Sequence, residues 1–191
     1  MRLFLTFVML AWFGSASSVA AAEFDSTYTK LNLKDCQKGE SNDDEGWANW
    51  MCAGYKGIPI YFGHADLREF VGYGPDARNT CSARTTFQRF NAAGTTVEWR
   101  LRRGRPVATI LRFRVEGDGL KEQFLVVTKL DGAKACPMGY VDARVRNHNQ
   151  AARDLADQNV ARFSCGNDVP LVISPKYDRP DAFATAGACL P

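Results

Sequence analysis

Residues 95–130 read TTVEWRLRRGRPVATILRFRVEGDGLKEQFLVVTKL, and this stretch decides the fold. Apolar and polar side chains alternate in residues 97–102 and again in residues 107–115, which is the period of a strand with one buried face. The tetrapeptides RGRP and EGDG separate the runs and are typical of tight turns. Further strands are expected at residues 124–130 and around residues 136–141. Successive strands joined by short turns predict an antiparallel meander.

One helix is expected after the meander. Its apolar residues recur at helical spacing and form one stripe: Ala152, Leu155, Ala156, Val160 and Phe163. Asn147 is a candidate N-cap with Gln150 in the capping-box position, and Gly166 suits the residue that ends a helix. Because the sheet offers the only large apolar face, we expect an α+β fold: an antiparallel β-meander sheet with one C-terminal helix packed across it.

The 191 residues suffice for one domain, and a hydrophobic content of 46% is too high for a disordered chain. Residues 1–22 are typical of a signal peptide, because Arg2 precedes an apolar run and small residues end at Ala22. We expect a single domain over residues 23–173, with residues 23–48 polar and loop-like, and an irregular, Pro-containing tail over residues 174–191. No transmembrane segment is predicted after the leader.

All six cysteines follow the predicted leader: Cys36, Cys52, Cys81, Cys136, Cys165 and Cys189. An even number in an exported chain predicts three disulfides and a periplasmic or secreted protein. Many pairings are possible, and local context favours Cys36–Cys52, Cys136–Cys165 and, by elimination, Cys81–Cys189. A metal site is the alternative, but no C-x-x-C motif occurs and the two histidines are far apart in sequence. We therefore predict no metal and no cofactor.

Arginine dominates residues 84–114, where eight arginines stand against Glu98 as the one acidic residue. The alternation places four of them on one face of two adjoining strands: Arg100, Arg102, Arg112 and Arg114. Because guanidinium groups capture carboxylate or phosphate in a bidentate manner, this face predicts a docking surface for an anionic partner. The alternative is that these arginines cover apolar neighbours or pair with carboxylates such as Asp142, Asp154 or Asp157.

Catalytic signals are sparse. The chain has only two histidines, His64 and His148, and it contains neither a G-x-S-x-G elbow nor an S-x-x-K motif. We therefore predict a non-enzymatic protein that binds an anionic envelope component or an acidic protein partner, and not nucleic acid, since the chain is exported. The oligomeric state stays open.

Two other functions are carried as alternatives. The first is a protein inhibitor of an envelope-degrading enzyme, because small stapled β domains are preorganised for binding. Its inserting element would be the acidic loop at residues 43–46, which Trp47 and Trp50 flank. The second is a small enzyme of unknown chemistry.

Several short motifs resemble those of an uncharacterised family of exported, periplasmic bacterial proteins with no known activity. They are Tyr28-Thr29-Lys30-Leu31, Cys36, Trp50-x-Cys52-x-Gly54-Tyr55-x-Gly57-Ile58-Pro59, Asp66-Leu67-Arg68, Glu98-Trp99-Arg100-Leu101 and Pro106-x-Ala108-Thr109-Ile110-Leu111-Arg112-Phe113. The resemblance would span most of the mature chain. It implies secretion and a shared fold, and it implies no substrate or catalytic residue.

Overall fold

The computed structural model describes residues 23–185. The larger of its two sheets has the spatial order β1-β6-β7-β8-β9-β10. Its strands are β1 (Phe24–Lys30), β6 (Phe90–Arg102), β7 (Arg105–Gly117), β8 (Leu120–Asp131), β9 (Lys134–Asp142) and β10 (Leu171–Ile173). Strands β6 to β9 are successive antiparallel neighbours, whereas β10 runs parallel to β9 and makes the sheet mixed. The antiparallel part of the prediction is therefore confirmed, and a purely antiparallel sheet is not.

A second, four-stranded antiparallel sheet lies beside the first and has the order β2-β3-β4-β5. Its strands are β2 (Gln37–Asn42), β3 (Trp47–Ala53), β4 (Pro59–Ala65) and β5 (Arg68–Tyr73). The prediction that residues 23–48 are loop-like is wrong, because β1 and β2 lie there. Strand β1 is held by pairing along its whole length with β6, and β2 is an edge strand of polar residues that pairs with β3.

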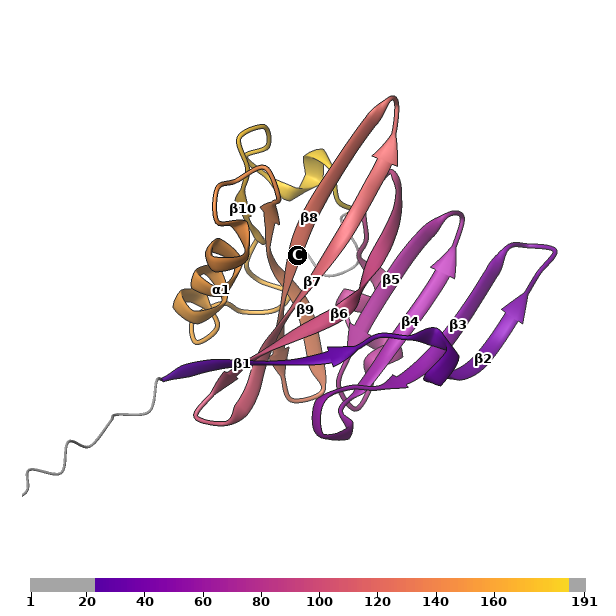
Figure 1. The fold of residues 1–191 in the computed structure, drawn as a ribbon, viewed down its shortest axis with the longest axis horizontal. Helices are drawn as coiled ribbons and strands as arrows, with labels where there is room; N and C mark the ends of the chain where they lie inside the picture. Colours follow the sequence, from indigo (N-terminus) through magenta and orange to yellow (C-terminus); the bar gives the residue numbers. More distant parts are fainter. Residues whose placement is uncertain (1–22, 186–191) are drawn as a thin grey trace, which may run out of the picture.

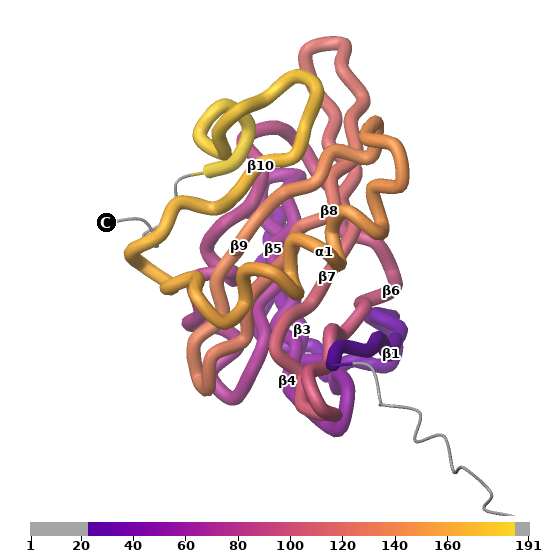
Figure 2. The backbone as a smooth tube through the Cα atoms, turned by 90° about the vertical axis from the view of Figure 1, so that its left-hand side faces the viewer, coloured from indigo at the N-terminus to yellow at the C-terminus, as the bar shows by residue number. Residues whose placement is uncertain are grey.

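The elements form three layers. Helix α1 (His148–Asn159) lies on one side of the six-stranded sheet, and the four-stranded sheet lies on the other (Figure 1; Figure 2). One apolar cluster joins the two sheets, and a second joins α1 to the six-stranded sheet. The helix-facing side of the larger sheet is thus a different surface from the side that faces β2 to β5.

Trp99 is the centre of the cluster between the sheets. It is fully buried, and its indole N–H donates to the Thr29 hydroxyl at 2.8 Å. The ring of Tyr73 meets it edge-on at a centroid distance of 6.0 Å. A Cβ at Gly54 would lie 2.4 Å from the indole ring, so only glycine fits at this close approach. The sequence motif around Gly54 therefore serves the packing of Trp99.

Helix α1 buries the apolar stripe that the sequence predicts, and Ala152, Leu155 and Ala156 are almost inaccessible to solvent. The predicted capping box is wrong. Asn147 has a left-handed backbone with φ 57° and its side chain caps nothing, while the Gln150 amide donates to Asp154. The helix ends at Asn159, so Gly166 belongs to a later turn.

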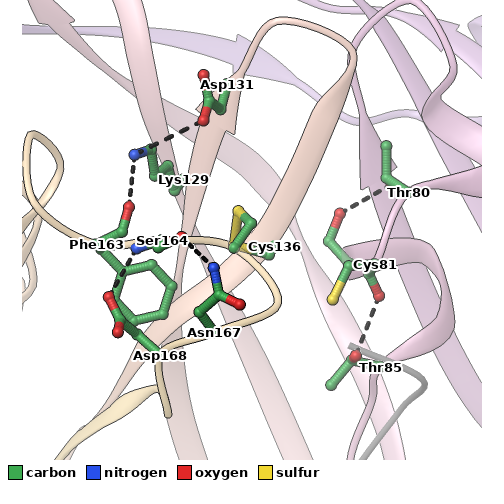
Figure 3. Close-up of a disulfide and its surroundings, with 12 residues drawn as sticks. Thr80, Cys81, Thr85, Lys129, Asp131, Cys136, Phe163, Ser164, Asn167 and Asp168 are labelled. Atoms are coloured by element: carbon green, nitrogen blue, oxygen red, sulfur yellow. Dashed lines mark hydrogen bonds and ion pairs between the residues drawn. A yellow bond between two sulfur atoms is a disulfide. The ribbon is translucent and has the colours of Figure 1, made fainter. Parts of the chain in front are cut away.

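Two of the predicted disulfides are confirmed, Cys36–Cys52 and Cys136–Cys165, with Cα atoms 4.4 and 5.8 Å apart. Cys81 is also disulfide-bonded, and its predicted partner Cys189 lies outside the described residues. Figure 3 shows Cys136 beside the segment that follows α1, where the Lys129 ammonium donates to the Phe163 carbonyl at 2.6 Å. This end of the chain is therefore held to β8 and β9 by both a covalent and a polar link.

The described part of the predicted tail, residues 174–185, packs into the same core as the rest of the domain. The Phe183 ring stacks on Phe124 at a centroid distance of 4.7 Å. The Tyr177 hydroxyl donates to the buried Glu122 carboxylate. The same carboxylate forms ion pairs with Lys176 and Arg144. Tail and hairpin β7–β8 are thus joined by one polar cluster.

Across residues 23–185, no helix is long and apolar enough to cross a membrane. Over the same range, no three His, Cys, Asp or Glu side chains gather closely enough to hold a metal ion.

Candidate functional site

The four predicted arginines do share one face of the six-stranded sheet. Arg100 lies beside Ala108 in the β6–β7 register and Arg112 lies beside Leu125 in the β7–β8 register, and both neighbours belong to the cluster under α1. The arginines therefore project from the side that carries the helix. Their surroundings on that side differ sharply.

Arg100 is buried under the helix. Its guanidinium binds the Asp157 carboxylate of α1 through Nε and Nη2, with Nε donating to Oδ1 at 3.0 Å, and Nη1 donates to the Ser26 hydroxyl at 2.6 Å. Only 8% of the Arg100 side chain is exposed. The group ties α1 to β1 and β6, so a ligand has no access to it.

Arg102 is neutralised near the sheet edge. Its Nε and Nη2 donate to one oxygen of Glu23 at 2.9 and 2.6 Å, and its guanidinium lies 5.6 Å from the centre of the Phe24 ring. Arg102 is half-buried. The first two predicted site residues are therefore paired with carboxylates, as the alternative interpretation of the sequence expects.

Arg112 and Arg114 differ from them because neither forms an ion pair with a carboxylate in the described chain. Arg112 donates only to neutral groups: Gln123 at 3.2 Å, Asn149 at 3.2 Å and, depending on the tautomer, the His148 ring at 3.0 Å. Arg114 is exposed, and residues 23–185 supply it with no hydrogen-bond acceptor. Two residues of a strand span about 7 Å, so the two cations stand next to each other.

These two arginines line an open groove of about 280 Å³ between the sheet and the start of α1, which we call the basic groove. Its other lining residues come from β1, β6, β7, β8 and α1: Tyr28, Gly94, Thr95, Thr96, Glu98, Ile110, Leu125 and Asn149. Lys30 stands at its edge, where the ammonium donates to the Thr96 hydroxyl at 3.0 Å. Lys30 is not among the predicted site residues, because residues 23–48 are predicted to be loop-like. In β1 it lies two residues after Tyr28, so both project from this face.

The carboxylate of Glu98, which lines the basic groove, is paired with Arg153. Arg153 of α1 binds both Glu98 oxygens, at 2.6 and 3.2 Å, and the same guanidinium donates to the Tyr28 hydroxyl at 3.1 Å. The Ser26 hydroxyl also donates to Glu98. With Glu98 compensated in this way, the charges left over in the groove are those of Lys30, Arg112 and Arg114.

Glu69 of β5 interacts electrostatically with Arg114. Burial raises the pKa of Glu69 above its usual value, and a hydrogen bond from the Ala93 N–H and the charges of His64 and Arg114 oppose that shift. The Glu69 carboxylate is committed to the Ala93 backbone. It therefore weakens the field of Arg114 without neutralising it by direct contact.

The histidines form no catalytic pair among residues 23–185. His148 contacts Arg112 and the Val145 carbonyl, and no described group hydrogen-bonds to the His64 ring. A nucleophile and its base would have to lie within hydrogen-bond reach of each other. That the protein is not an enzyme nevertheless stays a prediction.

The acidic loop at residues 43–46 is the turn of the β2–β3 hairpin. The Asn42 side chain accepts from the backbone N–H groups of Asp44 and Glu45, which closes a solvated turn. Trp50 points inward and meets the Phe62 ring edge-on at 5.8 Å. Of the two flanking tryptophans, only Trp47 is near the loop surface, which leaves the inhibitor alternative without a paired aromatic anchor.

The chain matches no protein-family model, and searches of curated proteins and of solved structures find no match. The resemblance to exported bacterial proteins accordingly stays a prediction.

Proposed function

We propose that the protein is exported and non-catalytic and binds an anionic component of the bacterial envelope through the basic groove. The observation that carries the proposal is a contrast on one sheet face. Arg100 and Arg102 are paired with carboxylates. Arg112 and Arg114 line an open hollow with Lys30 at its edge, and none of these three has such a partner among residues 23–185. Three uncompensated cations around a groove attract an anion, and two neighbouring guanidinium groups can bind it in a bidentate manner.

Export and a periplasmic or secreted location belong to the same proposal. The disulfides support it, because such bonds persist in oxidising compartments. In such a compartment the available polyanions are acidic glycans, anionic lipid headgroups and acidic proteins, and the proposal commits to an envelope component.

A salt titration tests the proposal. The mature protein is expected to bind dextran sulfate, and raising the salt from about 50 to 200 mM should weaken binding roughly ten- to fortyfold, because two or three contacts release counterions. Neutral dextran is the matched control and should not bind. Isothermal titration calorimetry measures both affinities. Equal binding of the charged and neutral polymers, or binding that salt leaves unchanged, would contradict an electrostatic site.

A further inference from the structure

A second groove crosses the outer face of the four-stranded sheet, away from the core. It is open, measures about 420 Å³, and takes one aromatic side chain from each of three strands: Trp47 of β3, Tyr61 of β4 and Phe70 of β5. All three rings are partly exposed. Among the inward residues of the same strands, Phe62 belongs to the buried cluster and Trp50 packs against it. We call this hollow the aromatic groove.

Gly63 leaves space for the Tyr61 ring in the aromatic groove. In the register of β3, β4 and β5 it lies between Asn49 and Phe70, so the two flanking positions are about 10 Å apart. A Cβ at residue 63 would lie 2.9 Å from the Tyr61 hydroxyl and 3.1 Å from the ring. The Tyr61 ring therefore lies along the sheet over Gly63. Together with Trp47 and Phe70 it gives the groove an aromatic surface.

The polar groups around this surface are partly used and partly free. Glu45 accepts from the Trp47 indole N–H at 2.9 Å and orients the ring, and Arg78 lies 3.4 Å from Glu40. Within the described range 23–185, Arg84 donates only to the Asn79 carbonyl, at 2.8 Å. No described group hydrogen-bonds to the Tyr61 hydroxyl. The aromatic surface is thus bordered by a hydroxyl and a guanidinium to which the described residues supply no carboxylate.

From this arrangement we infer that the aromatic groove binds one acidic sugar ring, a pyranose that carries a carboxylate. The C–H groups on one face of a pyranose are weakly positive and pack on the negative faces of aromatic rings. The Tyr61 hydroxyl hydrogen-bonds to a ring hydroxyl, and Arg84 pairs with the carboxylate. Ligand sites of this kind combine an aromatic lining with a few placed polar groups.

The inference goes beyond the proposed function, because the two grooves lie on different sheets and share no lining residue. The basic groove selects for charge alone. The aromatic groove selects for a ring with an apolar face and a negative charge. An experiment can therefore contradict the ligand proposed for one groove without contradicting the ligand proposed for the other.

The test compares the binding of an oligogalacturonide with that of a neutral galacto-oligosaccharide of equal length, measured by intrinsic tryptophan fluorescence and by calorimetry. Wild-type protein is expected to bind the acidic oligomer more tightly. Tyr61→Ala should weaken that binding roughly tenfold through the lost ring surface. Arg84→Gln should weaken binding of the acidic oligomer roughly fivefold and leave the neutral oligomer unchanged.

Two control variants separate the sites and guard against misfolding. Met51→Ala removes an exposed neighbour of Tyr61 that does not line the groove, so it should keep wild-type affinity. Arg112→Ser weakens the basic groove, which can also bind an acidic oligomer, so Tyr61→Ala is measured in the Arg112→Ser background as well and should still weaken binding roughly tenfold there. The inference is overturned if the acidic oligomer does not bind at about 10 mM. It is equally overturned if folded Tyr61→Ala binds like wild type, or if its effect disappears in the Arg112→Ser background.

Discussion

Leu155→Ala is expected to lower the free energy of unfolding by about 2–5 kcal/mol, the range for removing a large buried aliphatic side chain. Leu155 is 3% exposed and lies in the cluster between α1 and the sheet. A Cβ built on Gly139 of β9 would lie only 2.6 and 2.9 Å from the two methyl carbons of Leu155, so helix and strand are in close contact there. Truncation leaves a cavity that this backbone contact cannot close. Urea denaturation followed by circular dichroism measures the loss.

Gln158→Ala is the matched control, because it alters an exposed residue of the same helix. Its effect should stay within about 0.5 kcal/mol. Equal, small losses in the two variants would show that α1 does not pack on the sheet as described.

Asp157→Asn is expected to cost about 3 kcal/mol, the lower end for breaking a buried ion pair by removing one charge. The Arg100 guanidinium would stay under the helix without its carboxylate, since the remaining partner in the described chain is the Ser26 hydroxyl. The partial exposure of Asp157, at 23% of its side chain, argues for that lower end. Thermal and urea unfolding both report the change.

Two further variants test whether the loss of stability comes from the unpaired Arg100 charge. Asp154→Asn alters an exposed carboxylate of the same helix, which accepts only from Gln150, and should cost less than about 0.5 kcal/mol. The double change Arg100→Met and Asp157→Leu removes both charges and should recover most of the lost stability. If Asp157→Asn costs no more than Asp154→Asn, Arg100 is not held by the helix and returns to the candidate binding residues.

The strong periodic signals of the sequence predict the centre of the fold. Alternation over residues 95–130 predicts strands that the structure has as β6, β7 and β8, and the stripe around Leu155 predicts the buried face of α1. Strand β2 carries no such signal, because all six of its residues are polar or glycine and it is an edge strand that pairs on one side. Its conformation comes from pairing with β3, which is a tertiary effect.

The site was predictable in part for a related reason. Strand alternation correctly places Arg100, Arg102, Arg112 and Arg114 on one face. It cannot tell where α1 crosses that face, and the crossing decides that Arg100 is buried against Asp157 while Arg114 stays exposed. Lys30 and Arg153 reach the same groove from segments distant in sequence, β1 and α1. No local pattern links them.

Anion binding at the basic groove is tested by the affinity for dextran sulfate of two charge-matched double variants. Arg112→Ser with Arg114→Ser removes the two uncompensated guanidinium groups of the basic groove. Arg105→Ser with Lys134→Ser removes two exposed positive charges at the other end of the sheet, about 30 Å along β7. Both double variants should melt near the wild-type temperature, because none of these four residues is buried.

We expect the groove variant to lose roughly tenfold or more in affinity and most of its salt dependence, while the control variant loses less than about twofold. Equal losses in the two variants would mean that the polymer responds only to net charge. Unchanged affinity in the groove variant would contradict the basic groove as the binding site.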